Sequence, residues 1–161
     1  MMAGVLRAGT SFIAYSASGV EIEVLYLAID LLLLFTIVGV YAYVRERSGW
    51  TGLLGFVLAL AGTGSIVGPD GTLGGVDMYV VGASTLSIGL TVLSVGAWRG
   101  AALPRAVCAL WIGSTLIGVG GYVAQGPGVW FTLAGLAFGV GFLLAGLRMW
   151  RDPEAETMGR T

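Results

Sequence analysis

The sequence predicts an all-α integral membrane protein, an antiparallel bundle of five transmembrane helices, on three observations. Of the 161 residues, 57% are hydrophobic and only 11% are charged, whereas about a quarter are charged in an ordinary soluble domain. Five helices of about 20 residues each would use about 100 positions, which leaves enough chain for the termini and four short connections. The apolar segments lack the alternation of membrane β-strands, so they must satisfy their backbone hydrogen bonds as helices.

Five apolar segments follow one another along the chain, each bounded by charged residues or by glycine and proline. They comprise approximately residues 24–44, 51–68, 78–98, 105–124 and 129–147. The boundaries are the charged stretch 45–47, the turn Pro-Asp-Gly at 69–71, the pairs Arg-Gly at 99–100 and Pro-Arg at 104–105, the turn Gln-Gly-Pro-Gly at 125–128, and Arg148 with Arg151. The chain therefore divides into an N-terminal extracytoplasmic segment (1–20), a transmembrane domain (21–150) and a cytoplasmic tail (151–161).

The arginines predict the orientation of the bundle. If the chain alternates sides at each helix, Arg7 falls on one side and seven arginines fall on the other: Arg45, Arg47, Arg99, Arg105, Arg148, Arg151 and Arg160. Positive residues are enriched in cytoplasmic loops. We therefore expect a multi-pass protein of the cell membrane with its N-terminus outside and its C-terminus in the cytoplasm.

The first twenty residues leave two structures open. Apolar residues between positions 5 and 16 would share one face of a short helix, opposite Arg7, Ser11 and Ser18. That pattern is typical of an interfacial helix lying on the outer membrane surface. The alternative is a loosely ordered tail.

Composition excludes several kinds of chemistry. The chain has no His, which excludes imidazole catalysis and His-ligated metal or haem, and it has no Lys, which excludes a Schiff base on lysine. Cys108 is the single cysteine, so multi-cysteine metal sites are excluded. We expect Cys108 to be a small buried residue, with palmitoylation or nucleophilic catalysis as alternatives. We expect no metal, no cofactor and, at a net charge of −1, no nucleic acid partner.

The first apolar segment carries the candidate ligand-binding residues. Asp30 lies inside it, where an ionised carboxylate is costly in lipid and must face protein or water. Glu23 and Tyr26 precede it by seven and four residues, so the three would line one helix face, descending from the outer surface. A proton or cation site is one interpretation of this strip. The other is that Asp30 bonds a neighbouring helix and serves packing.

Small residues at helical spacing predict helix packing. On the second segment they are Gly55, Ala59 and Gly62, and on the fifth they are Gly135, Gly139 and Gly146. Glycine lets two helix backbones approach closely, which matters in lipid because the hydrophobic drive between helices is absent there. We expect these two faces to contact other helices, within the chain or in a homo-oligomer.

Two stretches carry a resemblance to a known kind of protein. They are YVRERSGWTGLLGFVLALAGT at 43–63 and RGAALPR at 99–105. Together they resemble small bacterial membrane proteins of four or five helices whose function is unknown. The resemblance spans roughly residues 40–115 and implies a topology, with no activity, cofactor or catalytic residue to carry over.

Three functions of different classes are compatible with the sequence. The one we favour is a non-enzymatic helical bundle, structural or binding membrane lipid, a membrane protein or a second copy of itself. The second is a small carrier or channel in which Asp30 and Glu23 gather a proton or cation. The third is a lipid-modifying enzyme using Asp30 and Tyr26 as acid and base. The first needs no residue that the sequence lacks, whereas the others need partner groups that it does not visibly supply.

Overall fold

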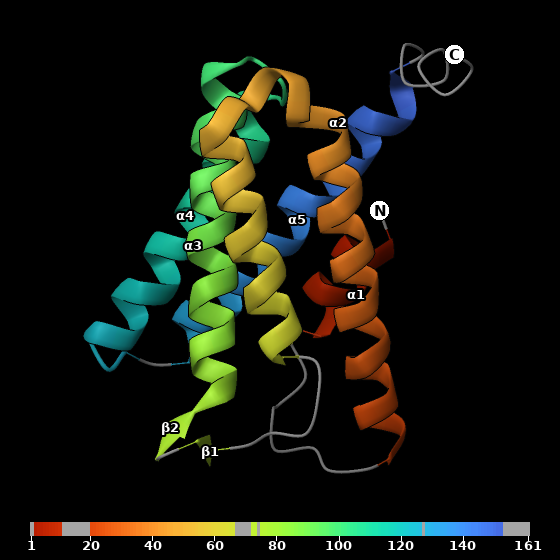
Figure 1. Cartoon of the computed structure of the whole chain (residues 1–161). Coiled ribbons are helices and arrows are strands. Elements are labelled where there is room, and N and C mark those ends of the chain that lie inside the picture. Colours follow the sequence, from red (N-terminus) through yellow and green to blue (C-terminus); the bar gives the residue numbers. More distant parts are fainter. Residues whose placement is uncertain (1, 11–19, 67–71, 74, 127, 153–161) are drawn as a thin grey trace.

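The computed structural model describes residues 2–10, 20–66, 72–73, 75–126 and 128–152, with side chains described except at 3, 7, 8, 10, 20–23, 72 and 73. These ranges form five helices and a small hairpin (Figure 1): α1 (Met2–Thr10), α2 (Val20–Ile66), β1 (Thr72–Leu73), β2 (Val76–Asp77), α3 (Met78–Arg99), α4 (Arg105–Val123) and α5 (Val129–Arg151). Four helices, α2 to α5, are long and apolar enough to cross a membrane. The expected helical bundle of membrane-length helices is thereby confirmed.

The count of long helices differs from the sequence expectation because α2 contains both of the first two apolar segments. It bends at Gly49, whose backbone angles of φ 59° and ψ −159° are non-helical, and the ribbon turns back on itself there (Figure 1). Glycine adopts a positive φ without the steric cost that other residues incur. The charged stretch 45–47 does not end the helix, since Arg and Glu are good helix formers. We call residues 20–48 the first limb and residues 50–66 the second limb.

The hairpin between α2 and α3 was not expected from the sequence. Thr72 pairs with Asp77 and Leu73 with Val76 in an antiparallel ladder, and Gly75 takes a positive φ of 83°. Asp77 then caps α3: its Oδ1 accepts hydrogen bonds from the backbone N–H groups of Tyr79 at 2.9 Å and Val80 at 3.3 Å. This cap satisfies donors at the start of α3 that have no partner within the helix.

The second limb of α2 packs on α3 almost backbone to backbone. A Cβ atom added at Gly55 would lie 2.7 Å from the carbonyl oxygen of Gly89, and one added at Gly62 would lie 2.7 Å from that of Gly82. Residue numbers rise along one helix as they fall along the other, so this pair runs in opposite directions. Side chains larger than hydrogen would hold the two helices apart at these positions.

The first limb faces the rest of the bundle with a stripe of apolar side chains. Ile29, Leu33, Ile37, Val40 and Val44 are all buried. The opposing core is formed mainly by α3, α4 and α5, with Leu90, Leu93, Val107, Trp111 and Phe142 among its most buried side chains. Near the bend the two limbs are joined by Tyr41 and Phe56, whose rings stack with centroids 4.2 Å apart.

The N-terminal residues 2–10 form the helix α1, which contacts α5 and the first limb of α2. In Figure 1 it lies at mid-height beside these two helices. A Cβ added at Gly4 would lie 2.6 Å from the Gly139 oxygen and 2.7 Å from the Leu143 nitrogen. Residues 2–10 are therefore helical and pack against the middle of α5, whereas the sequence alternative was a helix lying on the outer membrane surface. Residues 11–19, included in that alternative, lie outside the described residues.

Candidate functional site

The first limb carries two of the three candidate ligand residues where the structure describes their side chains. Asp30 and Tyr26 are both half-buried. Asp30 precedes Leu33 and Ile37 by three and seven residues, so it belongs to the buried stripe of this limb. Its side chain has an interaction partner in the protein. The side chain of Glu23 lies outside the described residues, so the predicted strip of three groups stays a prediction.

Asp30 lies deep in the bundle. Fifteen residues separate it from Arg45, which corresponds to about 22 Å along a helix, and ten separate it from the start of α2, or about 15 Å. A carboxylate this far from both ends of a membrane helix must be met by protein groups or by water. Asp30 therefore lies on the interior face, and its two interpretations from the sequence, a packing anchor or a proton and cation site, stay predictions.

The glycine faces expected from the sequence have different surroundings. Gly55, Ala59 and Gly62 are buried against α3. Gly139 is buried, and its carbonyl oxygen faces Gly4 of α1. Gly135 and Gly146 are half-buried in α5. The partners of the second limb are three glycines of α3 that the sequence reading had missed: Gly82, Gly89 and Gly96. Their spacing of seven residues, which matches that of Gly55 and Gly62, is the signal that could have revealed them.

Hydroxyl groups join α3, α4 and α5 inside the bundle. Thr91 donates to the Thr115 hydroxyl at 2.9 Å, and Thr115 lies 3.1 Å from the carbonyl oxygen of Ser87. Ser114 donates to the carbonyl oxygen of Ala134 at 2.8 Å. These bonds use the hydroxyls to connect neighbouring helices, which is their usual role in membrane bundles.

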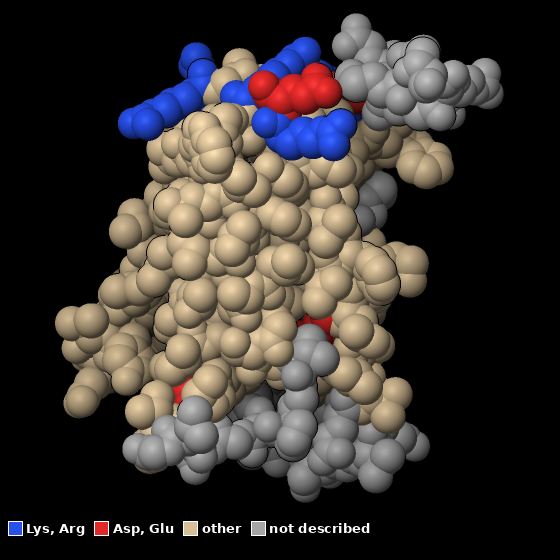
Figure 2. Space-filling model, viewed as in Figure 1, with Lys and Arg blue, Asp and Glu red and all other residues tan. Residues whose placement is uncertain are grey.

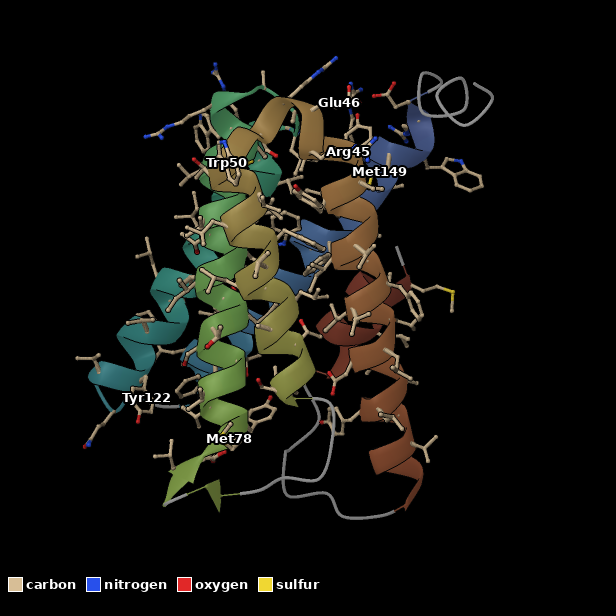
Figure 3. All side chains as sticks on the ribbon, viewed as in Figure 1. Arg45, Glu46, Trp50, Met78, Tyr122 and Met149 are labelled. Carbon is tan, nitrogen blue, oxygen red and sulfur yellow. The ribbon has the colours of Figure 1, made fainter. Side chains whose placement is uncertain are left out.

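Arginines gather at the end of the bundle where α2 bends. Figure 2 shows their side chains there, above a broad surface on which no Lys or Arg is visible. The described members are all exposed: Arg45, Arg47, Arg99, Arg105, Arg148 and Arg151. Trp50 and Trp150 are 85% and 84% exposed. Figure 3 places Arg45, Glu46 and Trp50 at the same end as Met149, and Met78 with Tyr122 at the opposite end. We call these six arginines and two tryptophans the arginine rim.

One cluster within this region ties the first limb to the end of α5. The Tyr43 hydroxyl donates to Oδ2 of Asp152 at 2.5 Å, and Arg148 lies 3.5 Å from the same oxygen. About one helical turn further along the first limb from the bend, a Cβ added at Gly39 would lie 3.8 Å from the terminal carbon of Met149. The cluster therefore closes the bundle at the arginine rim.

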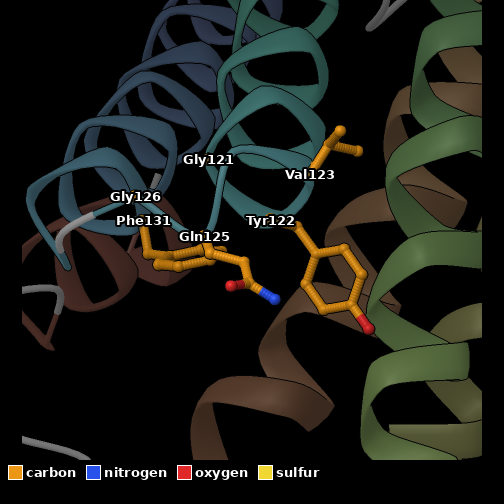
Figure 4. A pocket seen from close by; sticks show the side chains of 6 residues that line it. All are labelled: Gly121, Tyr122, Val123, Gln125, Gly126 and Phe131. Carbon is orange, nitrogen blue, oxygen red and sulfur yellow. The ribbon is translucent and has the colours of Figure 1, made fainter.

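The opposite end contains a shallow pocket where α4 connects to α5. It has a volume of about 510 Å³ and is lined by Gly121, Tyr122, Val123, Gln125, Gly126 and Phe131 (Figure 4). Its polar side chains are the phenol of Tyr122 and the amide of Gln125. The pocket therefore offers apolar contact and hydrogen bonding.

Cys108 and the arrangement of the acidic side chains bear on the chemistry that the sequence left open. Cys108 is fully buried, so its thiol is shielded both from an enzyme that would palmitoylate it and from a substrate that it would attack. Among the described residues, no group of three or more Cys, Asp or Glu side chains lies close enough to hold a metal ion. Comparison with models of known protein families, with curated proteins and with solved structures gives no match.

Proposed function

We propose that the protein is a non-enzymatic integral membrane bundle with five spans, formed by the two limbs of α2 and by α3, α4 and α5. The first limb would extend about 43 Å and the second about 25 Å, and a bilayer core is about 30 Å thick. The arginine rim supports an orientation in the cell membrane with the N-terminus outside and the C-terminus in the cytoplasm.

The role that the geometry supports best is binding of anionic membrane lipid at the arginine rim. The observation that carries this proposal is the gathering of six exposed arginines beside two exposed tryptophans. The described acids at this end are Glu46 and Asp152, and Asp152 is held by Tyr43 and Arg148. The rim therefore has an excess of positive charge at the level where lipid phosphates lie. Each arginine near such a surface contributes about 1 kcal/mol.

Thermal unfolding in vesicles tests this role. We expect a higher unfolding midpoint with phosphatidylglycerol present than in pure phosphatidylcholine. This difference in midpoint should be smaller in the triple variant Arg45→Gln, Arg47→Gln and Arg99→Gln. The matched control replaces the same three residues by Lys, which keeps the charge and should keep most of the difference. Equal midpoints in the two lipids for the unsubstituted protein would contradict lipid binding at the rim.

A second candidate, a proton or cation carrier, is supported by the placement of Asp30 on the buried stripe of the first limb. In that case Asp30→Asn should abolish pH-dependent flux in reconstituted vesicles while the fold survives, and Glu23→Gln should weaken the flux in part. Asp77→Asn, which removes an exposed carboxylate and keeps a side-chain oxygen that can cap α3, is the control. Absence of flux in the unsubstituted protein would argue for Asp30 as a packing anchor.

A further inference from the structure

The helix α1 is too short to cross a membrane, yet it touches α5 near that helix's midpoint. Its nine residues span about 13.5 Å, less than half of the bilayer core. Its contact residue Gly139 lies ten residues after Val129 and twelve before Arg151. If α5 spans the membrane as proposed above, α1 lies near the bilayer centre.

A helix that ends inside a bilayer needs shielding for its termini. The first four N–H groups and the last four C=O groups of any α-helix have no partner within the helix. Hydrocarbon cannot satisfy them, so such backbone is tolerated only where it is enclosed by protein or lines a water-filled space. Protein encloses one side of α1, because Gly4 meets the α5 backbone and Leu6 packs against the buried core, whereas Met2 and Val5 on its other side are 69% and 55% exposed.

Asp30 lies at the same depth as α1. Tyr43 meets Asp152, and Gly39 comes close to Met149. If both helices rise equally, each residue of the first limb therefore lies at the same depth as the α5 residue whose number is about 110 higher. The same offset places Gly139, the contact of α1, level with Asp30. The short helix and the one described carboxylate of the buried stripe are therefore neighbours in depth.

We propose that α1 is a re-entrant plug, which enters from the outer side and separates the space around Asp30 from the outer water. The proposal rests on the orientation proposed above. It assigns α1 a role that a surface helix or a tail would not have: when α1 is displaced, Asp30 becomes accessible from outside.

Cysteine accessibility tests the plug in the full-length chain. Asp30→Cys is combined with Cys108→Ala, and a charged, membrane-impermeant thiol reagent is added from outside to vesicles of known orientation. The position Gly4 is then varied to Ala and to Leu, because any Cβ there collides with the α5 backbone. We expect slow labelling with Gly4, and labelling about tenfold faster or more with Leu, with Ala between them.

Gly9→Leu is the matched control, because it makes the same change in the same helix at a position with nothing within 4 Å. It should leave the labelling rate unchanged. Rapid labelling of Asp30→Cys with Gly4 intact, or equally slow labelling across the Gly4 series, overturns the plug. If Gly4→Leu does not fold, Gly4→Ala decides the matter by the same criteria.

A separate cysteine distinguishes failure of the plug from failure of the orientation. Val76→Cys, on the exposed strand β2, should be labelled from outside in every variant. Labelling of Val76→Cys from the opposite side only would refute the proposed orientation. Outside labelling of Val76→Cys together with the contrary result at Asp30→Cys would refute the plug alone.

Discussion

The second limb of α2 and α3 meet through glycines, whereas the first limb meets α5 through side chains and through the inserted helix α1. In the first region, Gly55, Gly62 and Gly89 bring two backbones within van der Waals contact. In the second region, apolar residues such as Ile37 fill the interior, and the direct ties lie near the arginine rim, at Tyr43 and Asp152. One side of the bundle thus consists of two closely packed long helices, and the other contains the short helix α1.

This difference indicates where each kind of role can reside. Backbone-to-backbone packing tolerates almost no change, because helix backbones cannot move aside as side chains can. A helix of nine residues has a smaller interface to lose than two long helices, so its departure from α5 should cost less. Any movement linked to function is therefore expected between the first limb and α5, where Asp30 also lies, and the second limb with α3 would serve as the fixed frame.

The largest expected effect is at the glycine contact between α2 and α3. In Gly89→Leu the new side chain would begin 2.8 Å from the carbonyl oxygen of Gly55, so the helices must separate. We expect a loss of about 3 kcal/mol in the free energy of unfolding, at the upper end for an overpacked site. Unfolding in mixed micelles measures it. Gly64→Leu, on the same pair of helices but with nothing within 4 Å, should be nearly neutral, and equal losses in the two variants would contradict the fixed frame.

Much of the frame could be predicted from the sequence, because it follows from local composition. The apolar segments, the charged boundaries and the small residues Gly55 and Gly62 are visible in the chain itself. The break at Gly49 was less visible, since neighbouring glycines such as Gly52 are equally able to interrupt a helix. Which one bends is decided by the packing of the two limbs, a tertiary effect.

The position of α1 could not be predicted, and neither could its nearness in depth to Asp30. Amphipathic spacing indicates that a segment is helical, and leaves open whether its apolar face meets lipid or another helix. The contact between Gly4 and Gly139 joins residues far apart in the chain, and no repeated spacing in the sequence indicates it. Asp30 was identified because a carboxylate in an apolar segment is unusual, although its surroundings depend on helices that the sequence does not place.

The second expected effect, at Gly4, is smaller. Gly4→Leu should lower the free energy of unfolding by about 1–2 kcal/mol, because only the nine-residue α1 has to move away from Gly139. Thermal unfolding and hydrogen exchange together measure it, with exchange rising in α1 and staying low in α3. A loss as large as that of Gly89→Leu would show that α1 belongs to the frame.

The third expected effect lies at the tie between the first limb and α5. Tyr43→Phe removes the hydroxyl that donates to Asp152 and should cost about 1 kcal/mol, since the hydrogen bond is made to a charged acceptor at a partly exposed site. Tyr122→Phe, which changes an exposed phenol at the opposite end, is the matched control. If both substitutions have the same effect on the unfolding midpoint, the tie contributes nothing to holding α5.

The smallest expected effect concerns the hydroxyl contact between α3 and α4. Thr91→Val keeps the shape of the side chain and removes its bond to Thr115, which retains carbonyl acceptors in Ser87 and Trp111. Bonds of this kind between membrane helices contribute about 0.6 kcal/mol on average. Thr85→Val is the matched control, because the Thr85 hydroxyl bonds within its own helix to Val81. A clear difference in unfolding midpoint between the two variants would show that the fixed frame includes α4. Identical midpoints would restrict the frame to the second limb of α2 and α3.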